Sequence, residues 1–378
     1  MKLPHIINRQ HSLLAIFLFA LIFLCGCVPS FMATKLLKTA LQPTNTSKDT
    51  TVAWKNEIKE YPYIGTWRDS LTKVSALRDT FITAPDYANL HALFIKSAHH
   101  SNITAIVIHG HTSSSVGVAH LGYMYNHDLG YNVILPDLRL SGLSDGDHYT
   151  MGWDERKDIK LWIDLAKKIF SDSTQIVIHG VSMGAATTMM LAGDTLPQNV
   201  KWFVEDCGYT SVWEQFQYVL AKDYHISSKS LLKAAQKKAE KLYNLNFKKA
   251  SSEEQIKKSN LPMLFIHGDG DTYVPVKMVE QLYKKWNITD RTDFAAMRPE
   301  DYPILSDLYN AIQESYDHYE AADSLYPREM LRDLLLGLHS MCRGADARFF
   351  NGHTNIDRSK FLVFCVKGLD NMAENLRN

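Results

Sequence analysis

The chain has 378 residues, enough to bury one large hydrophobic core or two small ones. Its composition, 46% apolar and 22% charged, is that of an ordinary folded protein, and 41 basic residues balance 41 acidic ones. A formal net charge of zero gives no reason to expect nucleic acid or an acidic surface as a partner. The five cysteines form no C-x-x-C pair and no H-E-x-x-H occurs, so neither a disulfide framework nor a zinc motif is indicated.

The first 27 residues have the pattern of an export signal. Two basic residues precede an unbroken apolar run at 13–25, and a small residue follows it. The sequence L-C-G-C at 24–27 further resembles the bacterial lipobox, whose final cysteine, here Cys27, becomes the lipidated mature N-terminus. The alternative is an uncleaved anchor, since the apolar stretch approaches the roughly 20 residues that span a bilayer. Both alternatives predict an exported, membrane-tethered protein, with residues 28–60 as the tether.

After the tether, the hydrophobic pattern predicts an α/β fold. Residues 77–83 and 90–96 alternate in polarity as an antiparallel pair of strands would. Short apolar runs, typical of buried strands, then alternate with helical patterns. The predicted strands are 103–108, 132–135, 176–178, 200–204, 263–266 and 347–350, and the predicted helices are 116–129, 153–170, 185–191, 276–286 and 361–372. This order predicts a mostly parallel central sheet with helices on both faces.

Two stretches interrupt the alternation. Residues 209–260, aromatic at first and then rich in lysine, are predicted to form a helical cap over the carboxyl edge of the sheet. Residues 290–333 carry 11 acidic and 4 basic side chains, whereas 222–258 carry 10 lysines and 4 acidic side chains. The opposite charges suggest that an insertion at 290–340 packs against the cap and narrows a site. The alternative is two solvated helical faces, because exposed ion pairs are individually weak.

The sequence Gly180-Val181-Ser182-Met183-Gly184 separates the strand 176–178 from the helix 185–191. G-x-S-x-G between a strand and a helix is the pattern of a nucleophile elbow, whose serine sits on a sharp, strained turn. The glycines on either side let the strand and the helix approach each other closely. The pattern therefore predicts that Ser182 is a nucleophile; the alternative is an ordinary serine in a glycine-rich turn.

With the elbow, several motifs resemble those of the α/β-hydrolase family, in the family's order, from residue 77 to the C-terminus. They are His109-Gly110 after the third strand, D-L-R-L-S-G-L-S at 137–144, H-G-D-G-D-T-Y-V-P at 267–275, and Gly352-His353. The chain is most similar to the serine aminopeptidase-like branch, which includes monoacylglycerol-lipase-like esterases. It departs from the family pattern at Leu140 and Ser141, where Gly and His are usual, and at Val181, where His is common.

The resemblance implies an α/β-hydrolase domain at 61–378 with a Ser-His-Asp triad. Ser182 would be the nucleophile, His353 its base and Asp271 the acid that orients the imidazole. The backbone N–H groups of Met183 and His111 would stabilise the oxyanion.

Alternatives remain for two members of this triad. Asp269 or Asp206 could supply the acid in place of Asp271. The gap of 82 residues between Asp271 and His353 is longer than usual in the family, and His318 and His339 lie within it. These two histidines are more typical of surface or packing positions.

The sequence thus predicts a serine hydrolase that forms an acyl-enzyme on a small-molecule ester or a short peptide, without metal or organic cofactor. A carboxylesterase or lipase-like enzyme is the first interpretation and a serine aminopeptidase-like peptidase the second. Acyl transfer would use the same triad. A non-catalytic binding protein on the same scaffold is the alternative from another class.

Overall fold

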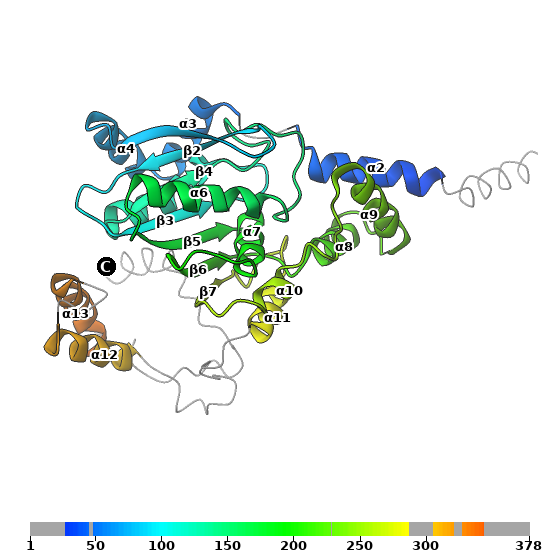
Figure 1. Ribbon diagram of the computed structural model, residues 1–378. Coiled ribbons are helices and arrows are strands. Elements are labelled where there is room, and N and C mark those ends of the chain that lie inside the picture. Colours follow the sequence, from blue (N-terminus) through cyan, green and yellow to red (C-terminus); the bar gives the residue numbers. More distant parts are fainter. Residues whose placement is uncertain (1–26, 45–47, 228, 287–304, 321–326, 344–378) are drawn as a thin grey trace, which may run out of the picture. The chain divides into compact units, whose positions relative to one another are not determined.

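The computed structural model describes residues 27–44, 48–227, 229–286, 305–320 and 327–343 (Figure 1). The chain divides into two compact units, Met1–Ile288 and Thr289–Asn378, and each unit is described by itself. The predicted strand at 347–350, the predicted helix at 361–372 and His353 lie outside the described residues.

The first unit is built on a seven-stranded sheet. The strands are β1 (Leu77–Thr83), β2 (Asn89–Ile95), β3 (Ile103–Ile108), β4 (Asn132–Pro136), β5 (Gln175–Val181), β6 (Val200–Asp206) and β7 (Met263–Ile266). Their order across the sheet is β1-β2-β4-β3-β5-β6-β7, with β1 and β4 antiparallel to β2 and all other neighbours parallel. This topology is that of the α/β-hydrolase fold, and the predicted fold class is confirmed.

The helices of this unit cover both faces of the sheet or lie beyond the ends of its strands (Figure 1). They are α2 (Cys27–Leu41), α3 (Thr50–Glu60), α4 (Tyr63–Lys73), α5 (Ala119–Tyr123), α6 (Glu155–Ile169), α7 (Met183–Ala192), α8 (Val212–Asp223), α9 (Lys229–Tyr243), α10 (Ser252–Ile256) and α11 (Lys277–Lys285), with a 3-10 turn at Val116–Val118 and a π-helical turn at Met124–Asp128. Alternate side chains of the central strands enter two separate hydrophobic clusters, as the two-residue period of a strand requires. One cluster contains the buried side chains of α6 and α7, and the other contains those of α3, α4 and α5.

The N-terminal segment, predicted as a tether, contains regular helices. Residues 28–60 include most of α2 and all of α3. Leu37 and Leu41 of α2 are buried in one cluster and Trp54 of α3 in the other. These helices form because their apolar side chains recur at helical spacing and so bury on one face. Within the described ranges, no helix combines the length and the apolarity needed to cross a bilayer.

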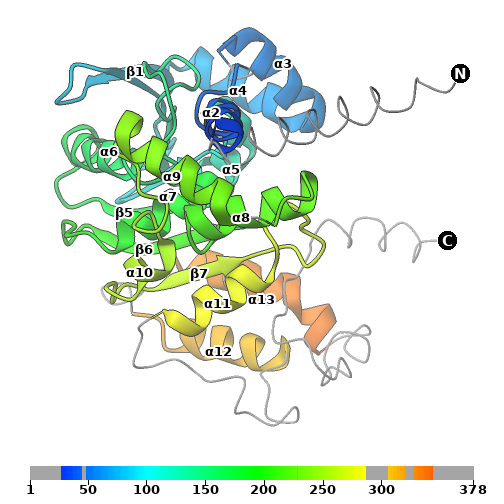
Figure 2. The same cartoon turned by 90° about the vertical axis from the view of Figure 1, so that its right-hand side faces the viewer.

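Residues 209–260, the predicted cap, contain the helices α8, α9 and α10. Helix α9 packs against α2, far away in the sequence, and the two helices lie beside α8 on the side of the sheet where β5 ends and α7 begins (Figures 1 and 2). Buried Leu231, Leu232 and Ala235 of α9 join the same hydrophobic cluster as α2. The N-terminal segment and the segment 209–260 are therefore packed together in the folded unit.

In the second unit, the described residues form a helical pair, α12 (Leu305–Asp317) and α13 (Arg328–Cys342). The pair is held by contact between the rings of Tyr309 and His339, and the guanidinium of Arg343 donates a hydrogen bond to Asn310 Oδ1 at 2.6 Å. The hypothesis that the insertion 290–340 packs against the segment 209–260 stays a prediction.

Candidate active site

Ser182 occupies a sharp turn between the central strand β5 and helix α7. Its backbone has φ 55° and ψ −112°, a region that non-glycine residues seldom adopt. The turn is fixed by hydrogen bonds on both sides: Ser182 N–H donates to the carbonyl oxygen of Asp206 at 2.8 Å, and Ala186 N–H donates to the carbonyl oxygen of Ser182 at 3.0 Å. Strain of this kind at a single polar residue is typical of a functional site.

The two glycines of the elbow are required by packing. A β-carbon on Gly180 would collide with the carbonyl oxygen of Gly184, and one on Gly184 would collide with the carbonyl oxygen of Ile108 on β3. Helix α7 therefore begins in direct contact with the end of the sheet. Met183 is its first residue, and the free N–H groups and positive dipole of this helix end lie beside Ser182.

A loop after β3, residues 109–117, passes beside the serine; we call it the HG loop. A β-carbon on Gly110 would lie 3.4 Å from Ser182 Cβ, which is ordinary van der Waals contact, so the backbone of the loop passes directly beside the serine side chain. His111 follows directly, which brings its backbone to the same end of the sheet as Ser182 and Met183. Three of the predicted site residues are thus brought together.

The buried side chain of His109 fixes the start of the HG loop. Leu138 N–H donates to His109 Nε2 at 3.0 Å, so the ring proton is on Nδ1, which donates to the carbonyl oxygen of Gly110 at 2.7 Å. Complete burial lowers the pKa of His109 and keeps the ring neutral, as this hydrogen-bond pattern requires. Its role is structural, and the sequence motif alone did not distinguish that role from a catalytic one.

Asp271 lies in the loop 267–275 after β7, which we call the acid loop. Its Oδ1 accepts the N–H groups of Tyr273 at 2.7 Å and of Val274 at 2.9 Å. Its Oδ2 lies 3.6 Å from His267 Nε2, but that ring nitrogen is 2.8 Å from the carbonyl oxygen of Val274 and donates there. Among the described residues, no group donates a hydrogen bond to Oδ2, so this oxygen can receive the N–H of another imidazole.

Cys207 joins the elbow to the acid loop. Its N–H donates to the carbonyl oxygen of Ile266 at 2.8 Å, which fixes the end of β6 to the end of β7. Burial raises the pKa of the Cys207 thiol to about 12, the carboxylates of Asp206 and Asp271 add to the increase, and the N–H of Ser182 opposes it. The thiol thus interacts with the backbone N–H of Ser182 at the elbow and with the charge of Asp271, and it is protonated at neutral pH.

The alternative acids occupy different surroundings. Asp206 ends β6 and places Oδ2 3.9 Å from the Nε2 of His179, on the other side of the elbow strand from α7. Asp269 is exposed in the acid loop. His318 and His339 belong to the second unit, where His318 bonds to its own helix and His339 contacts Tyr309. His353, the predicted base, lies outside the described residues.

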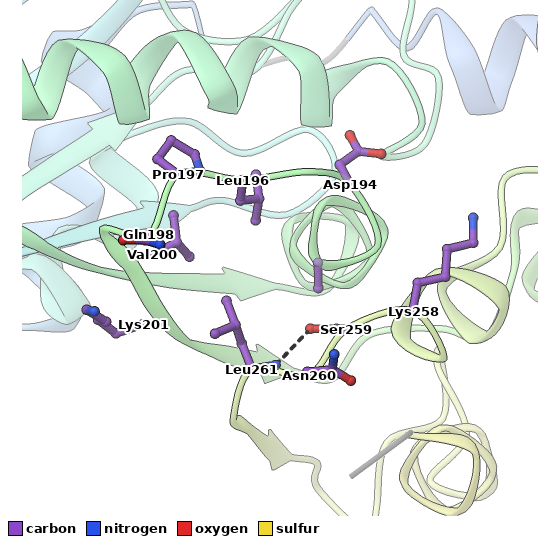
Figure 3. Close-up of a pocket in the computed structure, with 11 residues that line it drawn as sticks. Asp194, Leu196, Pro197, Gln198, Val200, Lys201, Lys258, Ser259, Asn260 and Leu261 are labelled. Atoms are coloured by element: carbon purple, nitrogen blue, oxygen red, sulfur yellow. Dashed lines mark hydrogen bonds between the residues drawn. The ribbon is translucent and has the colours of Figure 1, made fainter.

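A hollow of about 440 Å³ lies where β6 and β7 begin (Figure 3). Ser182 follows the end of β5, at the other end of the sheet. The hollow is lined by residues around the end of α7 and the starts of β6 and β7, among them Asp194, Val200, Lys201 and Leu261. Because ligands of open α/β sheets bind at the carboxyl ends of the strands, this hollow at the amino ends is no part of the candidate site. Among the described side chains, no three of the types His, Cys, Asp or Glu meet so as to hold a metal ion.

A known family matches this part of the chain. The sequence model of the prolyl oligopeptidase family matches residues 119–301, just under half of the chain, including the elbow and the acid loop. Together with this match, the sheet order and the strained serine between β5 and α7 decide the fold. The chain is an α/β-hydrolase by fold.

This α/β-hydrolase is 33% identical over 188 residues to the uncharacterized protein YqkD of Bacillus subtilis (strain 168). The match covers 50% of this chain and 61% of YqkD.

Solved structures of two Pyrococcus proteins are similar to this chain. The Pyrococcus furiosus esterase Pf2001 is 22% identical with a TM-score of 0.44, covering 58% of this chain and 85% of that one. The Pyrococcus horikoshii acylaminoacyl peptidase is 16% identical with a TM-score of 0.43, covering 56% of this chain and 34% of that one. Likenesses this distant do not bear on the substrate.

Proposed function

We propose that the chain hydrolyses carboxylic esters through an acyl-enzyme on Ser182, with His353 as base and Asp271 as acid. The observation that supports this most is the elbow. Ser182 has a φ of 55°, sits at the N-terminus of α7 and has Gly110 of the HG loop against its side chain. A serine hydroxyl held in this way beside a helix N-terminus is arranged for attack on a carbonyl carbon.

In the first half of the proposed reaction, Ser182 Oγ attacks the carbonyl carbon while its proton passes to His353. The resulting oxyanion receives hydrogen bonds from the N–H groups of Met183 and His111. When the C–O bond to the leaving alcohol breaks, His353 returns the proton to that alcohol. In the second half, water attacks the acyl-enzyme by the same route and Ser182 is released.

Asp271 supports the base in this scheme. Its Oδ1 is occupied by the two backbone N–H groups of the acid loop, which fix the carboxylate and leave Oδ2 for the imidazole. An acid held in this way orients the histidine and stabilises its protonated form.

The test is covalent labelling. A fluorophosphonate probe should label the wild-type chain and leave Ser182→Ala unlabelled, and hydrolysis of p-nitrophenyl butyrate should be lost in that variant. Ser113→Ala, which changes a hydroxyl of the HG loop, is the matched control and should remain labelled. Labelling of Ser182→Ala at the wild-type rate would overturn the proposal.

A peptidase is the second candidate, and one hollow favours it. A cavity of about 470 Å³ lies between α3 and the HG loop. It is lined by Ala53, Asn56, Glu57, Glu60, His111, Thr112, Ser113, Ser114 and Gly117. Carboxylates beside the HG loop are the groups that a substrate with a free α-amine would need, and Glu60 is exposed there.

The two candidates differ in their response to Glu60→Gln. For a peptidase, this substitution should raise KM for aminoacyl p-nitroanilides several-fold and leave p-nitrophenyl butyrate turnover unchanged. For an esterase, neither substrate should respond, and the anilides should be turned over slowly if at all.

We further propose that the enzyme is exported and tethered to the membrane of a bacterial cell envelope through its N-terminal segment. The export-signal pattern and the L-C-G-C sequence support lipidation at Cys27, with an uncleaved anchor as the alternative. Metabolic labelling with a palmitate analogue should mark the wild type and not Cys27→Ser. Labelling of neither chain, with both in the membrane fraction, would favour the anchor.

A further inference from the structure

Helix α2 ends against the HG loop. His111 Nε2 lies 2.8 Å from the carbonyl oxygen of Ala40, in the last turn of the helix. The next carbonyl, that of Leu41, accepts the N–H of Tyr149 at 2.8 Å. The last carbonyls of a helix have no partner within the helix and carry its negative dipole end, so they are strong acceptors.

The end of α2 is itself fixed in place. Ala33, Leu37 and Leu41 are buried in the larger hydrophobic cluster, and α2 packs along α9. Lys238 of α9 donates a hydrogen bond to Thr34 Oγ1. The carbonyl of Ala40 is therefore a stationary acceptor, and a residue bonded to it is held relative to the core.

In this contact, the imidazole of His111 can act only as a hydrogen-bond donor. Burial lowers its pKa, so the ring is neutral at neutral pH, and the proton must be on Nε2 for that atom to donate to a carbonyl oxygen. The ring also contacts Tyr149, with the centroids 4.9 Å apart, and Tyr149 Oη is 2.6 Å from Ser141 Oγ. The side chain is held at its tip and along its face.

The backbone beside His111 needs such support. Thr112, the next residue, has a φ of 60°, which costs free energy for a residue with a β-carbon. Ser113 N–H turns back to the carbonyl oxygen of Gly110 at 3.2 Å. A tight turn with a left-handed residue keeps its conformation only when the surrounding contacts fix it.

We propose that His111 is a positioning residue. The hydrogen bond from its ring to the last turn of α2 holds the N–H of residue 111 toward the oxyanion, so that α2 is a structural part of the active site. This inference rests on the proposed function. The imidazole of His111 holds the loop in place, whereas the backbone N–H of the same residue would contact the substrate.

The proposal is tested with His111→Ala and His111→Gln in the full-length chain. The Gln side chain places an amide N–H close to the position of His Nε2, whereas Ala removes the donor. With p-nitrophenyl butyrate, His111→Ala should lower kcat roughly 10- to 100-fold at nearly unchanged KM, since a displacement of about 1 Å can cost on the order of 10²-fold. His111→Gln should recover most of that loss, and His100→Ala, an exposed histidine outside the site, should match the wild type.

Inhibitor binding separates positioning from general damage. A boronic acid that forms a tetrahedral adduct with serine should bind His111→Ala at least tenfold more weakly, and a non-reactive planar amide analogue should bind as it does to the wild type. If His111→Ala does not fold, His111→Asn, whose amide is one methylene shorter, takes its place.

Fluorophosphonate labelling of the wild type and not of Ser182→Ala tests the proposed function separately. With labelling in place, an unchanged kcat in His111→Ala, or a loss that His111→Gln does not recover, would overturn the positioning role.

Discussion

The carboxylate Oδ1 of Asp137 accepts the backbone N–H of Ser115 at 2.6 Å, which ties the turn after β4 to the HG loop after β3. The other oxygen, Oδ2, accepts the N–H of Leu143 at 2.9 Å and the Nδ1–H of His91 at 2.6 Å. A β-carbon on Gly142 would collide with this carboxylate. The Asp and the last Gly of the D-x-R-x-x-G pattern are therefore explained by a buried carboxylate that accepts three hydrogen bonds and leaves no room for a side chain at residue 142. The motif supports the site without taking part in the chemistry.

Asp137 and His91 stabilise each other as an ion pair. Burial alone would raise the pKa of Asp137, but the hydrogen bonds from His91 and Ser115 and the positive charge of His91 outweigh it and lower that pKa. Burial alone would lower the pKa of His91, yet Asp137 and Asp79 raise it. The stability that Asp137 contributes to the folded state is therefore lost as pH falls through its lowered pKa. The stability that His91 contributes is lost as pH rises through its raised pKa.

Asp137→Asn should therefore destabilise the protein strongly at pH 7. Removing one charge of a buried pair leaves the other without compensation and costs about 3–5 kcal/mol. Urea unfolding followed by circular dichroism measures the change. Asp128→Asn, which removes an exposed partner of His127, should change the free energy of unfolding by less than about 1 kcal/mol. Equal effects of the two substitutions would contradict the role given to Asp137.

Gly184→Ala should disrupt the elbow, because the added β-carbon meets the carbonyl oxygens of Ile108 and His109, which cannot move without breaking the sheet. We expect a loss of about 3 kcal/mol or more, or no soluble protein. Gly270→Ala in the acid loop is the matched control, since a β-carbon there meets nothing within 4 Å. It should leave stability unchanged or raise it by up to about 1 kcal/mol. Thermal melting of both variants decides the comparison.

Much of this fold could be predicted from the sequence because each buried strand is a short apolar run of consecutive residues. The elbow was recognisable since Gly180, Ser182 and Gly184 have a fixed spacing between a strand and a helix. The acid loop was similarly marked by closely spaced residues. In each case the residues that determine the geometry are neighbours along the chain.

The role of α2 could not be predicted, because its partners are distant in the sequence. Leu37 and Leu41 follow an export-signal pattern, and nothing near them indicates that α9, about 200 residues later, covers their apolar face. The bond from His111 to Ala40 joins residues 71 positions apart. A histidine in a loop after a strand carries no signal for such a contact. The prediction of His353 as base stays a prediction.

Glu205, fully buried at the end of β6, should make stability depend on pH. Its Oε2 accepts the N–H of Gly208 at 2.9 Å, while Oε1 has no partner among the described residues. Burial raises the pKa of this carboxyl from 4.5 to about 8. Between these two values the folded chain holds a proton that the unfolded chain releases. The stability that Glu205 contributes to the folded state is therefore complete below pH 4.5 and is lost as pH rises toward 8.

Glu205→Gln mimics the protonated carboxyl and should remove this dependence. Across the window from 4.5 to 8, the wild type should lose stability relative to the variant by about 1 kcal/mol per pH unit. Melting temperatures at pH 5, 6.5 and 8 measure the difference. Glu60→Gln, on the exposed face of α3, should follow the wild type. Parallel curves for the wild type and Glu205→Gln would show that Glu205 titrates at its ordinary value.

The choice between Asp271 and Asp206 as the catalytic acid can be made by two isosteric substitutions. The acid must present one oxygen to the imidazole while the rest of the carboxylate is held still. Asp271 meets this requirement, because Tyr273 and Val274 N–H groups hold Oδ1 and Oδ2 remains available. The side chain of Asp206 has no such bonds among the described residues, and its Oδ2 lies 3.9 Å from His179 Nε2.

Asp271→Asn should therefore lower kcat for p-nitrophenyl butyrate by about 10⁴-fold, since an amide at this position favours the wrong tautomer of the base. Asp206→Asn should lower it less than tenfold, and Asp269→Asn, exposed in the same acid loop, should leave it unchanged. Fluorophosphonate labelling at pH 7 gives a second readout, because Asp271→Asn should label slowly, as a serine with a poorly oriented base would. If Asp206→Asn shows the large loss and Asp271→Asn the small one, the acid is supplied from the end of β6, and the bonds that fix Asp271 serve only to shape its loop.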